Sequence, residues 1–190
     1  MLQEEYYGVL YDYLHQGIIE RIPTGEIHKQ EGVFYMPHRP VIKEGSSSRV
    51  RPVFDCSAKS YNGKSLNDLL ETGPSLNPDL VSVMIRFRRW PVPLSGDVTK
   101  AFLQLFVRPD DKDVHRFLIK EGNNIIHMRF TRVPFGNTSS PFILNAVICY
   151  HLSCFPESDL IRSFKTTYMW ITTLVEPIVK KKPLRSTKEP

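Results

Sequence analysis

The segment around Asp97 limits the possible fold of this chain more than any other part of the sequence. A short, mainly apolar run ends at this single acid, a tight polar turn follows, and a large aromatic residue, Phe102, comes five positions later. Burying an unpaired carboxylate costs free energy, so an acid at the end of a buried strand is unfavourable for packing alone. It suits a metal site, because hard divalent cations prefer oxygen ligands. The structural alternative is an aspartate that caps the next turn.

Hydrophobic periodicity and capping residues predict three helices. Apolar residues at three- and four-residue spacing predict the first over residues 2–16. Asn77 as N-cap, followed by a proline and an acid, predicts the second over residues 77–89. The third covers residues 142–152, after the loop 133–141. That loop is either an ordinary helix start or a place where its glycine lets the backbone approach a ligand.

A basic hairpin is expected near the start of the chain. Residues 33–43 and 49–55 flank a polar turn, and the prolines in the first segment allow only edge strands. Lys43 and Arg51 then lie on the two arms. They form either a solvated face or a clamp on a polyphosphate, for which an arginine fork has suitable geometry.

A second hairpin is expected after the Asp97 segment. Residues 114–120 and 125–132 read as strands joined by a turn at residues 121–124. The adjacent acids Asp110-Asp111 follow a proline, which favours turn chemistry over metal binding. Residues 170–175 are a further strand candidate.

Net charge alone does not indicate a partner. The formal charge of +5 invites a nucleic-acid interpretation. Residues 176–190 hold five basic and two acidic residues, a charge of +3, so residues 1–175 carry only +2. The difference weakens the argument from charge.

The cysteines and the apolar runs indicate an intracellular protein, cytoplasmic or nuclear. Cys56, Cys149 and Cys154 are odd in number and lack metal-ligand spacing, which is typical of reduced thiols. The acidic start lacks the apolar core of a signal peptide. No apolar run approaches the roughly 18 residues of a membrane span.

Three separated motif regions then line up in one order. The first is Val-Phe-Asp-Cys-Ser-Ala-Lys at 53–59, followed by Ser-Leu-Asn-Asp-Leu-Leu-Glu-Thr-Gly-Pro-Ser-Leu-Asn-Pro-Asp-Leu at 65–80. The others are Leu-Ser-Gly-Asp-Val-Thr-Lys-Ala-Phe-Leu-Gln-Leu at 94–105 and Val-Pro-Phe-Gly-Asn-Thr-Ser-Ser-Pro-Phe at 133–142. Together they resemble the reverse transcriptase of BEL/Pao-type LTR retrotransposons, over roughly residues 5–168.

The resemblance implies an α+β fold and a polymerase site. It implies the fingers and part of the palm of a right-hand polymerase, with a mixed or antiparallel sheet backed by helices. Asp97 matches the family's first catalytic aspartate, and Val98 would contact metal through its carbonyl. Phe102 matches the aromatic residue that stacks under the incoming sugar and rejects a 2′-hydroxyl.

The same resemblance assigns the nucleotide contacts. Phe135 and Gly136 match the loop beside the nucleotide and template, Arg51 matches the fingers arginine on the triphosphate, and Lys43 is a weaker candidate for that role. The implied activity is RNA-directed DNA polymerase, with an RNA or DNA template–primer and dNTP as partners and no membrane. Nucleotidyl transfer uses two Mg²⁺ or Mn²⁺ ions about 3.5–4 Å apart, held by several converging carboxylates.

The sequence departs from the family where the metal site is completed. A hairpin carrying Tyr-x-Asp-Asp is expected near Tyr168, but residues 169–173 read Met-Trp-Ile-Thr-Thr. No aspartate follows Asp159. We therefore expect a partial reverse transcriptase domain over residues 1–168 and a divergent, disordered basic tail over residues 169–190.

A change of reading frame is one explanation for the departure. Met169 and Trp170 have single codons, and dropping two letters from ATG-TGG-AT gives codons for Val-Asp directly after Tyr168. The next shifted codon cannot encode aspartate if Ile171 and Thr172 are encoded normally. The match to the family motif is therefore partial.

Three functional hypotheses remain open at this point. The first is a retrotransposon reverse transcriptase fragment that is inactive alone, because one carboxylate cannot hold two metals. The second is a nucleic-acid-binding or interaction module without catalysis, whose affinity would depend on salt. The third is a chain that does not fold stably, because an incomplete palm sheet leaves an open edge and an exposed core.

Overall fold

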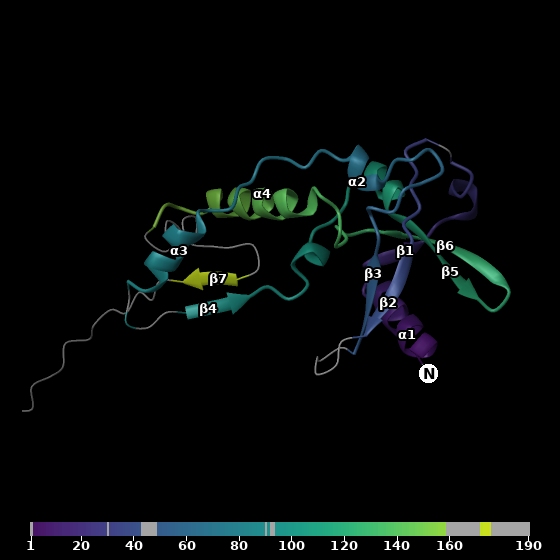
Figure 1. Ribbon diagram of the computed structural model, residues 1–190, viewed down its shortest axis with the longest axis horizontal. Coiled ribbons are helices and arrows are strands. Elements are labelled where there is room, and N and C mark those ends of the chain that lie inside the picture. Colours follow the sequence, from purple (N-terminus) through teal and green to yellow (C-terminus); the bar gives the residue numbers. More distant parts are fainter. Residues whose placement is uncertain are drawn as a thin grey trace, which may run out of the picture. The chain divides into compact units, whose positions relative to one another are not determined.

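The computed structural model describes residues 2–29, 31–42, 49–89, 91, 94–158 and 172–175. The chain divides into two compact units, each with strands of its own (Figure 1). Met1–Ser75 and Lys100–Leu144 form the first unit, and Leu76–Thr99 and Asn145–Pro190 form the second. The predicted boundary at residue 168 lies outside the described residues.

Helix α1 (Leu2–His15) opens the first unit and ends where the sequence predicts. Tyr6 and Leu10, one helical turn apart, are its buried residues. Gly17 has φ of +63°, and the amide of Ile18 donates to the carbonyl oxygen of Tyr13 at 2.9 Å. A left-handed glycine with this hydrogen-bond pattern closes a helix, because it satisfies carbonyls that have no partner within the helix.

A three-stranded antiparallel sheet follows the order β1-β6-β5. Its strands are β1 (Ile19–Arg21), β5 (Arg116–Glu121) and β6 (Asn124–Phe130). β5 and β6 form the predicted hairpin around Gly122, whose φ of +59° suits a tight turn. The hairpin prediction is confirmed.

The basic hairpin is also confirmed, as β2 (His38–Ile42) and β3 (Val50–Phe54). Its register places Pro40 opposite Pro52. Val50 and Phe54 are buried on one face of the hairpin. The Glu-Gly-Ser-Ser-Ser turn and Lys43 lie outside the described residues.

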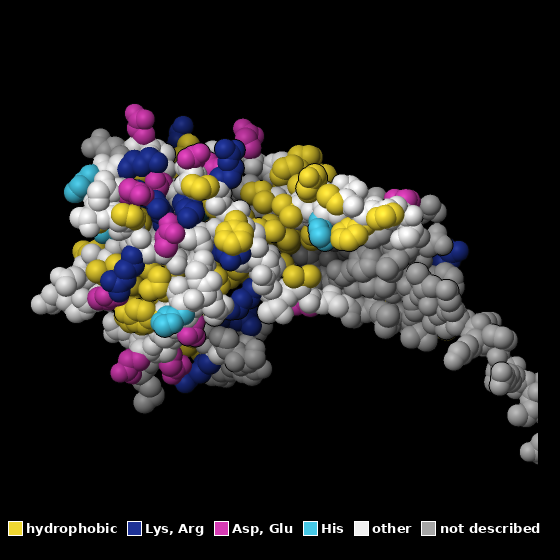
Figure 2. Space-filling view, turned by 180° about the vertical axis from the view of Figure 1, so that it is seen from behind, with side chains coloured by type: hydrophobic (Ala, Val, Ile, Leu, Met, Phe, Trp, Pro, Cys, Tyr) yellow, Lys and Arg dark blue, Asp and Glu magenta, His cyan; other side chains and the backbone are white. Residues whose placement is uncertain are grey.

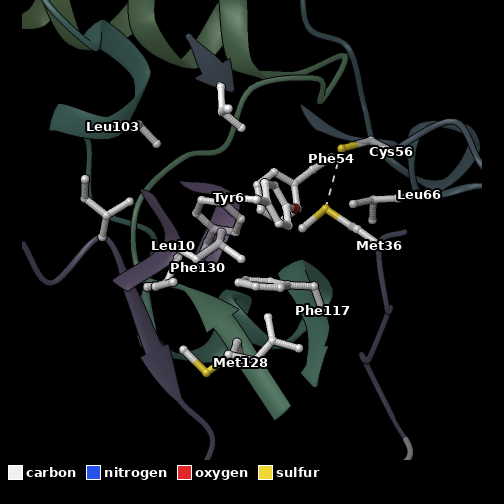
Figure 3. Close-up of a cluster of buried hydrophobic side chains, with 14 residues drawn as sticks. Tyr6, Leu10, Met36, Phe54, Cys56, Leu66, Leu103, Phe117, Met128 and Phe130 are labelled. Carbon is white, nitrogen blue, oxygen red and sulfur yellow. Dashed lines mark hydrogen bonds between the residues drawn. The ribbon is translucent and has the colours of Figure 1, made fainter. Parts of the chain in front are cut away.

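The core of the first unit joins the helix, the hairpin and the sheet (Figure 3). The ring of Phe54 on β3 meets Phe130 on β6 at a centroid distance of 4.7 Å and Phe117 on β5 at 4.9 Å, both edge to face. Tyr6 and Leu10 of α1 belong to the same cluster. Edge-to-face pairs add to the stabilisation from apolar burial, so these rings fix α1 and both hairpins in one layered body.

A buried carboxylate, Asp113, ties the sheet to the loop that follows β1. Its oxygens lie 2.8 Å from Arg129, 2.9 Å from Arg116 and 2.9 Å from Lys29, and its side chain is 4% exposed. Burial raises the pKa of a carboxyl group, but hydrogen bonds from the three cations outweigh it and lower the pKa of Asp113 to about 2. Asp113 is therefore charged at neutral pH.

Helix α2 (Leu66–Leu69) is a single turn fixed by its own side chains. Ser65 Oγ accepts a hydrogen bond from the amide of Asp68 at 3.2 Å, and Asp68 Oδ2 accepts one from the amide of Ser65 at 2.9 Å. This reciprocal pair is a capping box. Those two bonds define where the turn begins.

The second unit contains a helix and a strand pair. Helix α3 (Leu80–Phe87) has Asp79 as its N-cap, whose carboxylate accepts from the amide of Ser82 at 2.8 Å. The prediction of Asn77 as N-cap is wrong, because Asn77 Oδ1 instead accepts a hydrogen bond from Asn145 Nδ2 at 2.7 Å.

The strand pair consists of β4 (Leu94–Asp97) and β7 (Thr172–Val175), which run antiparallel. β7 lies within the strand predicted over residues 170–175. Helix α4 (Ser140–Ser153) begins in the first unit and continues into the second, close to its predicted extent. With its helices and antiparallel pairs, the chain has the predicted α+β class. Short 3₁₀ helices lie at Thr24–Glu26, Ala101–Gln104 and Pro109–His115.

The distribution of charge on the surface agrees with the conclusion that net charge alone does not indicate a partner. Figure 2 shows basic and acidic side chains interspersed on one face of the molecule. All three cysteines are free thiols, with Cys56 buried and Cys149 and Cys154 exposed. Among the described residues, no helix is both long enough and apolar enough to cross a bilayer.

Candidate functional site

Asp97 is the last residue of β4, and its side chain is exposed. Val98, the predicted carbonyl ligand, follows directly and is 51% exposed. Both residues belong to the second unit. The register of the strand pair places Thr172 of β7 opposite Asp97. The residue that faces this aspartate across the strand pair therefore carries no carboxylate.

The described donor set does not fit two divalent ions. Strand β7 reads Thr-Thr-Leu-Val and adds no acid to the pair. In the part of the chain that the structure describes, no group of three or more histidine, cysteine, aspartate or glutamate residues is arranged to hold a metal. Two ions held by carboxylates need several of them at one place, and Asp97 supplies one.

Lys100 has an unusual backbone conformation. It is the one described residue other than glycine with a positive φ, at +53°. Its Nζ donates to Gln16 Oε1 at 3.2 Å and lies 5.4 Å from the centroid of the Tyr13 ring. A lysine in the left-handed region carries backbone strain, and these two contacts with the end of α1 offset it. Sequence reasoning did not identify this residue.

Phe102 and Phe135 come together in the first unit. Phe102 is buried, at 7% exposure, in the 3₁₀ helix Ala101–Gln104, whereas Phe135 is half-exposed. Their ring centroids are 5.0 Å apart and the planes are nearly perpendicular. The structure therefore brings together two of the residues predicted to contact a nucleotide.

Gly136 must be glycine for two reasons. Its φ is +102°, a region that side-chain-bearing residues rarely adopt. A Cβ added there would lie 3.2 Å from the carbonyl oxygen of Phe54 and 3.4 Å from Cys56 Sγ. The glycine thus allows its loop to lie against the end of β3.

Asn67 of α2 holds this loop in place. Its Nδ2 donates to the carbonyl oxygen of Gly136 at 3.0 Å and to Ser57 Oγ at 2.9 Å. Its Oδ1 accepts from the amide of Thr138 at 3.0 Å. One side chain therefore connects α2 to the segment at Ser57 and to the loop at Gly136, which is 69 residues away in the sequence. The motif containing Asn67 was noted in the sequence, but nothing local signals this role.

A neutral histidine lies beneath the same loop. His115 is buried, and Asn137 Nδ2 is 2.7 Å from its Nε2. Burial lowers the pKa of His115 to about 4, because the charged form loses its hydration. His115 is therefore uncharged at neutral pH.

Arg51 lies on the solvent side of the basic hairpin. Strand residues alternate between faces, so the register places Arg39, Val41, Arg51 and Val53 on one face, and all four are exposed. We call these four residues the outer hairpin face. Lys43 lies outside the described residues.

Comparison with known proteins identifies the fold. No protein-family model matches the chain, and no curated protein does. The native prototype foamy virus protease-reverse transcriptase matches with a TM-score of 0.62 and 18% identity, covering 91% of this chain and 19% of that one. The foamy viral protease-reverse transcriptase dRH in complex with double-stranded DNA matches with a TM-score of 0.63 and 19% identity, covering 92% of this chain and 26% of that one.

These matches show that the chain has a reverse-transcriptase-like fold. They cover nearly all of this chain, which itself spans between a fifth and about a quarter of the length of those proteins. At this level of identity the likeness concerns the fold alone.

Proposed function

We propose that this chain is a piece of a BEL/Pao-type retrotransposon reverse transcriptase, with fingers and part of a palm over residues 1–168. The reverse-transcriptase-like fold supports the polymerase assignment. The ordered motifs of the sequence support the BEL/Pao assignment. Residues 169–190 form a divergent tail in this proposal.

Each candidate residue then has a role. In a complete enzyme, Asp97 and the carbonyl of Val98 would contribute to the metal site, Phe102 would pack under the incoming sugar, and Arg51 and Lys43 would contact the triphosphate. Phe135 and Gly136 form the loop beside nucleotide and template. The contact between the Phe102 and Phe135 rings supports a shared nucleotide pocket for these two residues.

We further propose that the chain does not catalyse nucleotidyl transfer by itself. The observation that carries this proposal is the register of β4 and β7, which puts Thr172 opposite Asp97. Bound Mg²⁺ or Mn²⁺ would supply charge neutralisation for phosphoryl chemistry. A single carboxylate and a backbone carbonyl are too few donors to hold two such ions.

Primer extension tests this proposal directly. The chain is incubated with an RNA template, a labelled DNA primer, dNTP and either Mg²⁺ or Mn²⁺. We expect no extension. Extension that disappears in Asp97→Ala would overturn the proposal, because it would show a working site built on this residue.

Restoring the acids gives a positive test. Trp170→Asp together with Ile171→Asp recreates Tyr-Met-Asp-Asp from Tyr168. We expect this variant to bind Mn²⁺ more tightly than the unmodified chain in isothermal titration calorimetry, and Asp97→Ala to remove the gain. An unchanged affinity would count against the assignment of these positions.

A frameshift or mis-splicing event accounts for the altered motif in this proposal. The partial match in the shifted frame after Tyr168 supports it. Sequencing the locus and its transcript tests it. An intact frame without homologous coding sequence downstream would overturn it.

Nucleic-acid binding without catalysis is the second candidate function. One structural neighbour is a reverse transcriptase in complex with double-stranded DNA, and the outer hairpin face of this chain exposes Arg39 and Arg51. Contacts between cations and phosphates weaken as salt rises, because bound counterions are released. Titration of a labelled duplex at low and high salt should show falling affinity. Binding that is absent, or that salt leaves unchanged, would contradict this candidate.

A further inference from the structure

Helix α3 turns an apolar side toward solvent. Successive residues of an α-helix are about 100° apart, so Leu80, Val81, Met84 and Ile85 lie on one side of it. Each of these four side chains is between 43% and 67% exposed. We call them the α3 stripe. A surface helix normally presents its polar side to solvent, and an apolar side there marks a surface that binds a partner.

The opposite side of α3 is the buried one. Val83 is fully buried, and Phe87, one turn later, is partly buried. Residues four apart lie on the same side of a helix, so the fold covers α3 through these two side chains. The α3 stripe points away from them. Its exposure therefore has no role in the packing of the chain itself.

Opposite charges stand at the two ends of the stripe. Arg88, the C-cap residue, continues the stripe because it follows Met84 by four residues and Ile85 by three. Its guanidinium is exposed and has no hydrogen-bond or ion-pair partner among the described residues. Asp79 is the exposed N-cap, and the hydrogen bond from the amide of Ser82 lowers the pKa of its carboxyl group. At neutral pH the stripe therefore runs from an anion to a cation.

This arrangement of charges is complementary to itself. When two copies of α3 pack antiparallel, the apolar stripes meet and each Arg88 comes level with Asp79 of the partner subunit. A two-fold axis relates the copies, so both charge pairs form together. Within one chain the same two residues are separated by the eight residues of α3, roughly 12 Å of helical rise. They can therefore pair between copies but not within one.

We propose that the α3 stripe is a dimer interface, on which a second copy of this chain packs its own α3 in the antiparallel direction. Burial of the apolar side chains drives the association, and the two Asp79–Arg88 pairs fix its direction and register. A helix of eight residues buries less than the roughly 800 Å² per partner of a standard interface, so the dimer is weak and separates readily. The inference does not depend on the polymerase assignment.

The two end charges favour a second copy over other occupants. An anionic membrane surface attracts Arg88 but repels Asp79, so it suits only one end of the stripe. A helix of another protein would suit both ends only if it repeated the order of acid, apolar residues and base. A second copy of this chain always has that order.

Analytical ultracentrifugation tests the proposal. Sedimentation velocity of the unmodified chain, from about 2 to about 200 µM, should show a change from monomer to dimer, as expected for a small interface. Ile85→Gln should weaken dimerisation about ten-fold or more, because it places a polar amide in the middle of the stripe. Ile125→Gln, at a similarly exposed isoleucine of β6, is the matched control and should have no effect.

A double-mutant cycle tests the antiparallel direction. Asp79→Asn keeps a capping side chain but removes the charge, and Arg88→Gln removes the cation. Each should weaken the dimer about two- to ten-fold. The double variant should weaken it no more than either single variant, because all three lose the same pair. Thermal melting of dilute samples should show every variant folded like the unmodified chain.

Several outcomes would overturn the inference. These are a chain that stays monomeric at the highest concentration, a dimer that Ile85→Gln leaves unchanged, association that continues beyond the dimer, and additive effects of the two charge variants. A monomeric chain that cosediments with vesicles of phosphatidylcholine and phosphatidylserine would assign the α3 stripe to a lipid surface instead. Primer extension tests the proposed function separately, so the failure of one leaves the other standing.

Discussion

Asp113 in the first unit and Asp97 in the second show the same side chain in opposite settings. Asp113 is buried and lies within 2.9 Å of Arg116, Arg129 and Lys29. Asp97 is exposed at the end of a strand and faces Thr172 in the register. The first carboxylate is neutralised by the fold itself. The second is the predicted metal ligand, and the described residues of its strand pair add none of the further acids that a two-metal site requires.

The two aspartates show that forming the fold and assembling a metal site are separate requirements. The first unit has an aromatic core and a fully paired carboxylate, both of which depend on residues distant in sequence. The strand pair of the second unit forms as well, but its described residues provide one acid. A reverse-transcriptase-like fold is therefore present although the described residues supply only one acid at the predicted metal site.

Removing Asp113 should have the largest effect on stability. Asp113→Ala leaves the fully buried Arg116 and the mostly buried Arg129 without their shared partner. We expect a loss of about 3–5 kcal/mol in the free energy of unfolding, measured by urea denaturation. Asp97→Ala and the matched control Asp110→Ala, both at exposed residues, should change it by less than about 0.5 kcal/mol. Equal effects at Asp113 and Asp97 would contradict the comparison.

Lowering the pH should remove the charge of Asp113 with a smaller loss of stability than Asp113→Ala causes, because the side chain remains in place. The pKa of Asp113 is lowered from 3.8 to about 2 in the folded chain. Its contribution to stability is therefore complete above pH 4 and is lost as the pH falls through 2. The stability difference between the unmodified chain and Asp113→Asn should shrink over this range. Denaturation curves that stay equally far apart from pH 6 to pH 2 would refute this.

Two glycines extend the comparison to the backbone. Gly136→Ala places a Cβ 3.2 Å from the Phe54 carbonyl oxygen at a φ of +102°, so we expect a loss of about 1–3 kcal/mol in unfolding free energy. A Cβ on Gly96 of β4 meets nothing within 4 Å. Gly96→Ala is therefore the control, with a change below about 0.5 kcal/mol. A large loss at Gly96 would show packing around β4 that the described residues do not provide.

The smallest effect is expected from adding an acid opposite Asp97. Thr172→Asp places like charges in register, which should lower the stability by about 0.2–1 kcal/mol in EDTA. Mn²⁺ should raise the Tm of this variant more than that of the unmodified chain, since two carboxylates then meet at one place. Thr173→Asp, whose register partner is Gly96, is the matched control. Equal Mn²⁺ responses in the two variants would argue against Asp97 as a metal ligand.

Much of the fold follows from local patterns in the sequence. The end of α1 at Gly17 and the turn at Gly122 come from glycines placed where a positive φ is needed. Both hairpins follow from alternating residues around polar turns. These features need only neighbours in sequence, and for that reason they could be predicted.

The parts that could not be predicted depend on distant partners. Asn77 is not the N-cap of α3, because its side chain is bonded to Asn145, 68 residues away. Asp113 looks like one acid among several in a turn, and only the folded sheet brings Arg129 to it. Asn67 likewise gains its role from the loop at Gly136, 69 residues along the chain. The roles predicted for Asp97, Val98 and Arg51 stay predictions.

The facing prolines of the basic hairpin have a consequence for self-association. Pro40 and Pro52 occupy opposite positions of β2 and β3, and neither has an amide hydrogen to donate. Such a pair fits the ladder only where the missing hydrogens would point outward. Each outer edge of the hairpin therefore lacks a donor at its middle, which disfavours pairing with an incoming strand and so opposes fibril-type association at this hairpin.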